Sequence, residues 1–300
     1  MVDNLQKTLK KSLSNVKDQE ITDDDYGGTY LFFSFDLVNS TAFKNKNKKW
    51  GNVFDGFIKQ SKLSMTDEFP YIKIWKMVGD ELLFYMKVND VSDLHFAPKK
   101  TYKVLKDCIK FIEKNEGVKS YLSIKATIWT AVVYDSDEKD TEKYKNIIIK
   151  EIDVNDYILD FLGTDIDEGF RISKFVIGGI LAVDAKLACF IANIESEKNN
   201  DNISDFMRIV SYQQLKGIWD NRHYPIVWYM DNWDKVNDTF VYDEKYNNDI
   251  VKQICDTKES DLHKVPFLKK ILSDLNKLDT VKDLEDGIKP QIITNKGDPK

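Results

Sequence analysis

The stretch Thr29-Tyr-Leu-Phe-Phe-Ser-Phe-Asp-Leu-Val-Asn-Ser-Thr41 constrains the fold more than any other part of the chain. Its apolar, aromatic first half predicts a buried strand, which ends on the carboxylate of Asp36 before small residues that can begin a helix. A second segment, Trp75-Lys-Met-Val-Gly-Asp80, predicts a strand that turns and places Asp80 at the tip of a hairpin. Two carboxylates at rigid strand ends are the ligands that Mg²⁺ ions take together with substrate phosphates.

A third segment, Asp160-Phe-Leu-Gly-Thr-Asp-Ile-Asp-Glu-Gly-Phe-Arg171, supplies further polar groups. Arg171 is one of only three arginines among 44 basic residues. Where lysine is the default cation, an arginine indicates a position that needs a planar, multi-donor group for phosphate or carboxylate. The three segments together point to nucleotide chemistry.

Composition limits the class of protein. The 300 residues can bury a sizeable core, and 42% hydrophobic with 31% charged residues is typical of a soluble globular protein. A net charge of −6 argues against a nucleic-acid partner. No apolar run approaches the ~20 residues of a membrane span, and the first residues are too polar for a signal peptide, so we expect a cytoplasmic protein without a membrane partner. Cys108, Cys189 and Cys255 have no metal-ligand spacing and indicate reduced thiols.

The order of periodic segments predicts an α+β fold. Strands are expected over about 29–37, 71–78, 81–88, 122–134, 147–161, 180–183, 207–210 and 224–230. Helices are expected over about 43–63, 99–114 and 167–176. A further helix is expected to follow the strand at 180–183 and to end at about residue 194. Strands and helices alternate without a regular βαβ repeat, which favours a mixed sheet. We expect an N-terminal arm over 1–27, one domain over 28–232, and a C-terminal extension over 233–300 that is partly helical with a disordered tail.

The three segments resemble, in order and internal spacing, the motifs of the class III nucleotidyl cyclases. The resemblance covers residues 28–232 and implies a cyclase catalytic domain with a mixed, mainly antiparallel sheet flanked by helices. Two Mg²⁺ or Mn²⁺ ions are then expected at Asp36, Leu37 and Asp80. The resemblance assigns Lys76 and Asp160 to the base.

The remaining roles follow from the same resemblance and from the chemistry of the residues. Asp167 is expected to position the ribose, and Arg171 to stabilise the transition state. Lys216 or Arg222 supplies a further phosphate-binding cation, and the sequence does not say which. The start of the helix at Asn39, Ser40 and Thr41 suits the β- and γ-phosphates, because helix N-termini present free N–H groups.

The chain departs from the family at Asp167, where the family has Asn, and at Gly169-Phe170, where it has small residues. Residues 163–174, 215–219 and 222–229 look most like the pyrimidine cyclases of Pycsar antiphage defence. That resemblance implies that UTP or CTP is converted to cyclic UMP or cyclic CMP, which a separate effector senses as an alarm signal.

Base choice stays open at the level of hydrogen bonds. Lys76 donates and Asp160 accepts, which suits cytosine and uracil but also adenine. Adenylate cyclase activity is therefore the alternative. A catalytically inactive cyclase-like module for regulation or dimerisation is a second alternative, although such a module usually lacks a metal aspartate or the arginine. Asp167 and Arg171 are also spaced for a local ion pair along a helix.

The position of Lys76 predicts an assembly. Lys76 is four residues from Asp80 on one hairpin, yet one is expected to read the base and the other to bind metal, at distant ends of a nucleotide. In the cyclases that this chain resembles, a head-to-tail dimer solves this problem by building each site from two subunits. We therefore expect a homodimer with two composite active sites for a nucleoside triphosphate.

Overall fold

The computed structural model describes residues 27–114, 122–135, 145–152, 157–195, 202–233 and 268–288. Its strands are β1 (Gly28–Val38), β2 (Lys73–Val78), β3 (Glu81–Lys87), β4 (Ser123–Asp135), β5 (Asn146–Ile152), β6 (Tyr157–Gly163), β7 (Leu181–Val183), β8 (Met207–Gln214) and β9 (His223–Tyr229). Its helices are α2 (Ser40–Lys46), α3 (Trp50–Glu68), α4 (Val91–Glu113), α5 (Thr164–Ile172), α6 (Ala185–Glu195), α9 (Leu268–Asp274) and α10 (Leu278–Ile288). None of these described helices is long and apolar enough to cross a membrane.

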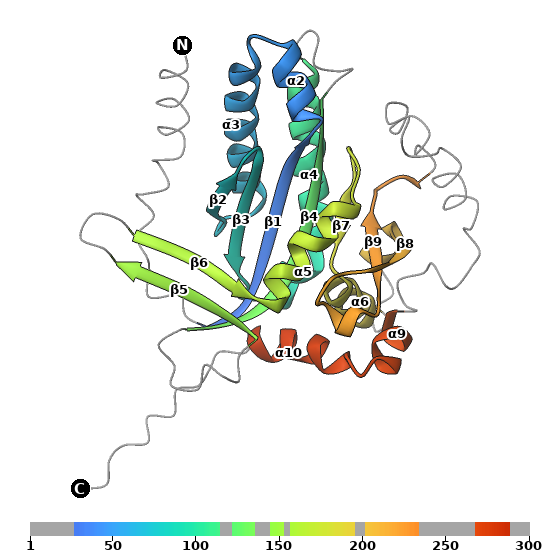
Figure 1. The fold of residues 1–300 in the computed structure, drawn as a ribbon. Helices are drawn as coiled ribbons and strands as arrows, with labels where there is room; N and C mark the ends of the chain where they lie inside the picture. Colours follow the sequence, from blue (N-terminus) through green and yellow to red (C-terminus); the bar gives the residue numbers. More distant parts are fainter. Residues whose placement is uncertain are drawn as a thin grey trace, which may run out of the picture.

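The strands form one mixed sheet in the order β2-β3-β1-β4-β7-β9-β8, and the β5–β6 hairpin joins it through β4 (Figure 1). Only the pairs β4–β7 and β4–β5 are parallel among the described strands. The expected α+β class with a mainly antiparallel sheet is confirmed.

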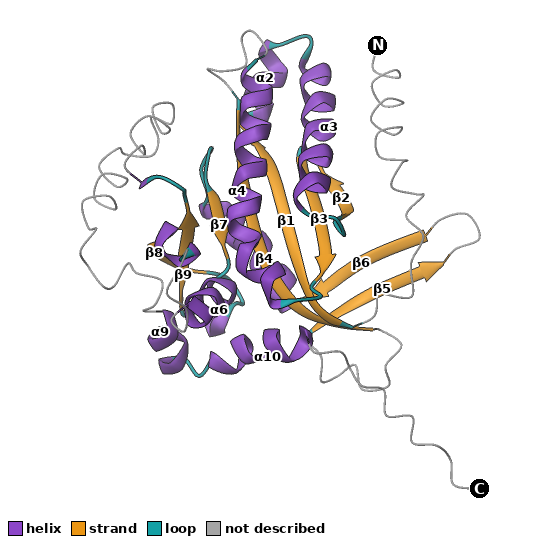
Figure 2. Ribbon diagram, turned by 180° about the vertical axis from the view of Figure 1, so that it is seen from behind, coloured by secondary structure: helices purple, strands orange, loops and turns teal. Residues whose placement is uncertain are grey.

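Helices cover the sheet on both faces. Seen from behind, α3 and α4 lie side by side over one face, and α5 packs against β4 on the other (Figures 1 and 2). The β5–β6 hairpin projects away from this body, and α10 runs below it against β1, β4 and α6. The face that carries α5 thus lies beside the β5–β6 hairpin, and both carry residues of the expected site.

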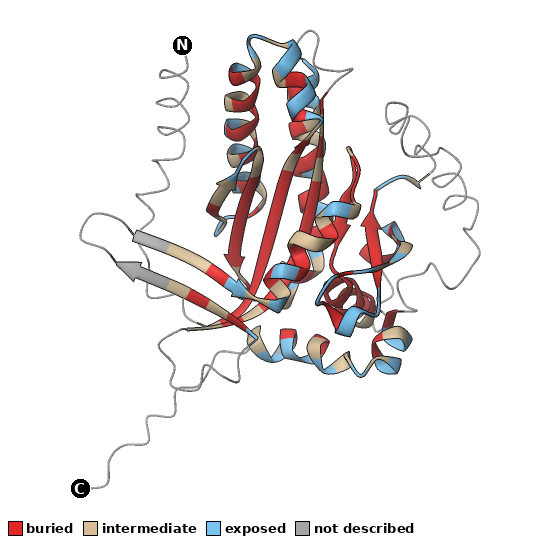
Figure 3. Ribbon diagram, viewed as in Figure 1, coloured by how far each residue is buried: buried red, intermediate tan, exposed pale blue. Residues whose placement is uncertain are grey.

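Strand β1 is the centre of the core because both of its faces are covered. Its five apolar residues at 30–33 and 35 have no exposed surface (Figure 3). Phe32 stacks on Trp129 of β4, and Phe33 packs on Phe69 beyond the end of α3. A run of consecutive apolar residues is what a strand buried on two faces requires. The same strand then carries Asp36 out of the core to a partly exposed position.

The helices differ from the sequence expectation in two places. The helix expected to carry residues 43–63 is two helices, because Asn47 leaves the helical region at φ −116° and its side chain accepts a hydrogen bond from the backbone N–H of Lys49. Leu63, expected on the apolar face, is 59% exposed. Helix α4 starts well before Lys99, because Asp90 caps it with a reciprocal capping box.

Helices α9 and α10 lie within the C-terminal range where the sequence pattern is weak. Helix α10 sits close to β1: the hydroxyl of Thr29 donates to the backbone carbonyl of Leu284 at 2.8 Å. At Gly287 a Cβ atom would lie 2.3 Å from the Thr29 hydroxyl, so the close contact of α10 with β1 requires glycine at this position. The expectations for residues 1–26 and for the tail at 289–300 lie outside the described residues.

Candidate active site

Two carboxylates and a lysine lie side by side on three neighbouring strands at the end of β1. The strand register places Asp36 directly between Glu81 of β3 and Lys125 of β4. The Nζ atom of Lys125 lies 3.2 Å from Asp36 Oδ2. Asp80 precedes Glu81 at the hairpin turn, and Lys44 Nζ of α2 lies 3.8 Å from its Oδ1. The structure therefore brings the two expected metal aspartates to one end of the sheet.

The electrostatics of this group suit a hard cation. Burial raises the pKa of Glu81, and the negative charges of Asp36 and Asp80 raise it further, against the opposing effects of Ser34 and Lys125. Three neighbouring carboxylates thus hold more negative charge than the two lysines balance. Within the described ranges no group of three or more His, Cys, Asp or Glu side chains is arranged to hold a metal ion. A cation here would need oxygens of the substrate as well, which is how Mg²⁺ is usually bound at phosphate sites.

The turn after β1 differs from the expected cap. Asn39 has a left-handed backbone at φ 65°, and its side chain makes no capping hydrogen bond to α2. Asn tolerates this conformation better than most residues, and its backbone carbonyl, not its side chain, accepts the first hydrogen bond of α2, from the N–H of Phe43 at 3.0 Å. Ser40 is buried and Thr41 is exposed at the start of α2. The side chain of Leu37 is buried and carries no oxygen, so the only oxygen that this residue offers is its backbone carbonyl.

Lys76 and Asp160 meet although 84 residues separate them. Lys76 Nζ lies 2.7 Å from Asp160 Oδ1 and 3.0 Å from Oδ2, which joins β2 to the β5–β6 hairpin. Trp75 also contacts this carboxylate: its Nε1 donates to Asp160 Oδ1 at 2.9 Å. The sequence interpretation paired Lys76 with Asp160 by resemblance but missed Trp75.

Helix α5 presents Asp167 and Arg171 one turn apart. Asp167 is exposed, and no ion pair forms between it and Arg171 in the part of the chain that the structure describes. The Nε atom of Arg171 is buried and has no hydrogen-bond partner there. A buried donor without a partner is costly, so an acceptor that reached this atom would stabilise it.

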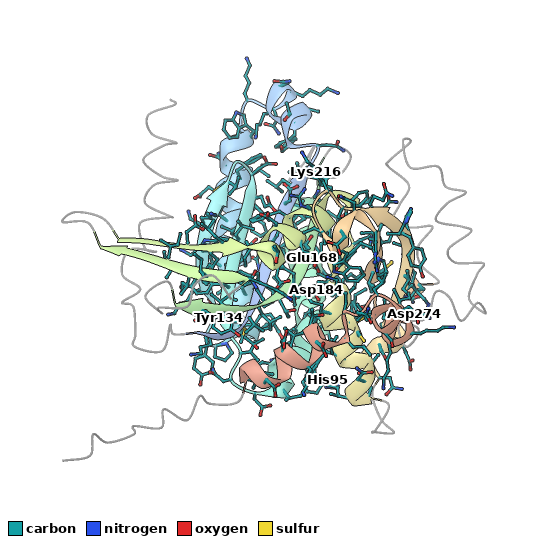
Figure 4. All side chains as sticks on the ribbon, turned by 60° about the horizontal axis from the view of Figure 1, so that its bottom comes forward. His95, Tyr134, Glu168, Asp184, Lys216 and Asp274 are labelled. Atoms are coloured by element: carbon teal, nitrogen blue, oxygen red, sulfur yellow. The ribbon has the colours of Figure 1, made fainter. Side chains whose placement is uncertain are left out.

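Lys216 and Arg222 lie apart from these groups. Both are exposed around the turn between β8 and β9, where Figure 4 labels Lys216. No contact among the described residues joins either side chain to the carboxylates or to α5. The choice between them stays open.

The architecture matches solved structures. The adenylyl cyclase CyaB from P. aeruginosa superposes with a TM-score of 0.52 at 12% identity, over 68% of this chain and 95% of that one. The chain has a nucleotide-cyclase fold. Two further similar structures are the guanylyl cyclase Cya2 (TM-score 0.49, 14% identity, 68% of this chain and 92% of that one) and the guanylate cyclase domain of RhGC from Catenaria anguillulae in complex with GTP (0.47, 10%, 68% and 96%). No protein-family model and no curated protein matches the sequence.

Within this cyclase fold, a buried charge cluster lies behind α5 that the sequence interpretation did not foresee. Figure 4 shows Glu168 and Asp184 close together in the centre of the molecule. Tyr224 donates its hydroxyl hydrogen to Glu168 Oε1 at 2.7 Å. Lys186 Nζ lies 2.6 Å from Asp165 Oδ1 and is 3% exposed. The cluster ties α5 to α6 and β9.

The cluster holds three carboxylates around one lysine. Burial raises the pKa of Glu168 to about 7, and the charges of Asp165 and Asp184 raise it while Lys186 opposes them. Burial also raises the pKa of Asp184, although Lys186 and three hydrogen bonds favour its ionised form. These acids stand at unremarkable sequence positions, so only the packing of α5 against α6 could reveal them.

Proposed function

We propose that this chain is a class III nucleotide cyclase that converts UTP or CTP into the 3′,5′-cyclic monophosphate and pyrophosphate. The observation that carries the proposal is the pair of carboxylates, Asp36 and Asp80, at one sheet end of a cyclase fold. The unpartnered buried Nε of Arg171 on α5 supports it, because a site for a triphosphate needs an unsatisfied donor.

The reaction joins two groups of one molecule. The 3′-oxygen of the ribose attacks the α-phosphorus, its proton leaves to solvent, and the bond to the β-phosphate breaks to release pyrophosphate. Nucleophile and electrophile are already linked, so the protein must fold the substrate and neutralise charge. When bound, two Mg²⁺ or Mn²⁺ ions acidify the 3′-hydroxyl and screen the triphosphate.

The chain's own residues supply the remaining functions. Asp36, Asp80 and the carbonyl of Leu37 hold the ions. Arg171 donates to charge that develops on the α-phosphate or the leaving group, and Asp167 positions the ribose. Asn39, Ser40 and Thr41 face the β- and γ-phosphates, with Lys216 or Arg222 as a further phosphate contact.

Lys76 and Asp160 recognise the base in this proposal. Their polarity suits uracil, cytosine and adenine alike. The similarity of residues 163–174 to the Pycsar cyclases favours a pyrimidine, and with it an alarm signal in antiphage defence that a separate effector senses. The same polarity fits adenine, and the similar structure of CyaB is named an adenylyl cyclase, so ATP is the alternative substrate.

A homodimer with shared active sites is part of the proposal. Lys76 and Asp160 pair within one chain, and only four residues separate Lys76 from Asp80, a span of at most about 13 Å. A head-to-tail pair of subunits would place the metal aspartates of one chain opposite the base-reading and transition-state residues of the other. We propose that this assembly acts in the cytoplasm.

The direct test is product formation from each nucleoside triphosphate. The full chain is incubated separately with UTP, CTP, ATP and GTP, with Mg²⁺ or Mn²⁺, and the products are separated by chromatography. Cyclic UMP or cyclic CMP is the expected product. Cyclic AMP alone would refute the pyrimidine assignment, and the absence of every cyclic product would refute the enzyme.

A further inference from the structure

A β-bulge in β2 turns two neighbouring side chains toward one carboxylate. The register with β3 pairs Ile74 with Phe84 and then Lys76 with Leu83, which leaves Trp75 as an extra residue. In a regular strand, successive side chains point to opposite faces, so Trp75 and Lys76 could not share a partner. The bulge removes this alternation, and both side chains reach Asp160.

The two oxygens of Asp160 are used unequally. Oδ1 accepts from Trp75 Nε1 at 2.9 Å, from Lys76 Nζ at 2.7 Å and from the backbone N–H of Phe161 at 2.9 Å. Among the described residues, Oδ2 accepts only from Lys76 Nζ, at 3.0 Å. A carboxylate oxygen with three donors has no acceptor site left, whereas Oδ2 retains one. The carboxylate is thus held in one orientation, with a single oxygen able to accept from a ligand.

The indole of Trp75 is itself fixed. It is 7% exposed and lies between the rings of Phe32, Phe161 and Phe170, with centroid distances of 5.5, 5.3 and 5.9 Å. Lys76 Nζ lies 4.4 Å from the centroid of the Trp75 ring. An indole N–H held by three aromatic neighbours is a rigid donor, because its ring cannot rotate without clashes.

We infer that Trp75 is a positioning residue that fixes the orientation of Asp160 and thereby sets the base selectivity of the site. The inference rests on the proposed function. A base must present a donor to Oδ2 and an acceptor to Lys76 in one fixed geometry. Cytosine and adenine offer an exocyclic amino group beside a ring nitrogen, whereas uracil and guanine offer a ring N–H beside a carbonyl. A carboxylate held in one orientation discriminates between these two geometries, and a freely rotating one accepts both.

The test compares Trp75→Phe with a matched control, Trp129→Phe. Trp129 belongs to the same aromatic cluster, stacks on Phe32 and is 1% exposed, but its Nε1 has no hydrogen-bond partner among the described residues. Both changes shrink one buried indole of the cluster, and only Trp75→Phe removes a donor from Asp160. Values of kcat/KM for UTP, CTP, ATP and GTP are measured for both variants, together with the Tm.

We expect Trp75→Phe to lower the kcat/KM ratio between the best and the second-best nucleotide by roughly tenfold, the size of a lost hydrogen bond to a charged group. Trp129→Phe should leave that ratio unchanged. Equal changes in the ratio for both variants would overturn the inference, as would an unchanged ratio in Trp75→Phe. A uniform fall in all four rates counts as an unchanged ratio.

A double-mutant cycle with Asp160→Asn shows whether Trp75 acts through this carboxylate. If it does, adding Trp75→Phe to Asp160→Asn produces no further change in nucleotide ranking; an additive change contradicts the inference. Calorimetric titration of the same four nucleotides gives their binding ranking independently of turnover. A chain that binds nucleotides but cyclises none would refute the proposed function, while the ranking of Trp75→Phe against Trp129→Phe would still decide the role of Trp75.

Discussion

At the scale of single residues, Asp36 and Asp80 carry charge rather than core volume. Both are partly exposed at the sheet end and pair loosely with Lys125 and Lys44. Asp36→Asn and Asp80→Asn should therefore each lower turnover by at least ~10²–10³, since each removes a ligand charge from the proposed metal site. The Tm should stay within a few degrees of the wild type, and product formation with a thermal melt measures both effects.

The control for these variants is Asp274→Asn. Asp274 is exposed on α9 and has no partner in the described part of the chain. This change should leave turnover unaltered. If both Asp36→Asn and Asp80→Asn kept more than a tenth of the wild-type rate, the assignment of the metal site would be wrong.

Glu168 predicts a pH dependence of stability. Burial raises its pKa to about 7 from 4.5, so between these pH values the folded chain binds more protons than the unfolded chain. The stabilising contribution is complete below pH 4.5 and is lost as pH rises through 7. Glu168→Gln does not titrate, so we expect the wild type to lose on the order of 3 kcal/mol relative to it between pH 5 and pH 8. Urea unfolding at several pH values measures this, and parallel pH profiles for the two proteins would contradict it.

The residues that sequence reasoning found differ from those it missed in a physical sense. Asp36 and Asp80 stand where an apolar run ends or a glycine turns the chain, so local sequence marks them. Local sequence does not mark Trp75, because its role depends on a bulge and on Asp160, 85 residues away. The sequence alone indicates that Glu168 is an exposed acid on the surface of a helix. Only the structure shows that it is buried and bonded to Tyr224.

At the scale of elements, α5 depends on close contact with β4. A Cβ atom at Gly169 would lie 2.2 Å from Cδ2 of Trp129, whose ring is stacked on Phe32 and cannot retreat. Gly169→Ala should therefore destabilise the fold by ~1–3 kcal/mol through overpacking. It should also lower turnover, because α5 carries Asp167 and Arg171. Chemical denaturation and the cyclase assay measure the two effects.

Gly56→Ala is the matched control for this helix contact. Gly56 is also helical and near an aromatic ring, since a Cβ atom would lie 2.8 Å from Cε1 of Phe111. Phe111 is only partly buried, so the tip of its ring can shift. We expect little change or a gain of up to ~1 kcal/mol from the better helix propensity of alanine. A larger loss for Gly56→Ala than for Gly169→Ala would contradict the close-contact account of α5.

The ends of helices and strands could be predicted where the apolar periodicity stops at a residue that breaks secondary structure, such as glycine. The ends of β1 and the β2–β3 hairpin came within two residues of the expected ones, because an apolar run or Gly79 marks them. The start of α4 was missed, because the expected helix began at residue 99 whereas the capping box at Asp90 begins it earlier. A partly helical C-terminal extension was expected, but the position of α10 and its docking on β1 were not, because its apolar residues are few and the docking depends on Thr29, far away in sequence.

At the scale of the whole molecule, the proposed dimer makes a quantitative prediction. Asp36 and Arg171 would belong to different halves of each shared site, so Asp36→Ala and Arg171→Ala should each be inactive alone. When the two variants exchange subunits at random, about half of the dimers are mixed, and each mixed dimer holds one intact and one doubly damaged site. About a quarter of the wild-type activity should therefore return on mixing, measured as cyclic product after exchange. The matched control mixes Asp36→Ala with Asp80→Ala, which damage the same half and should not complement each other. If subunits exchange and the first mixture stays inactive, each site is built within a single chain.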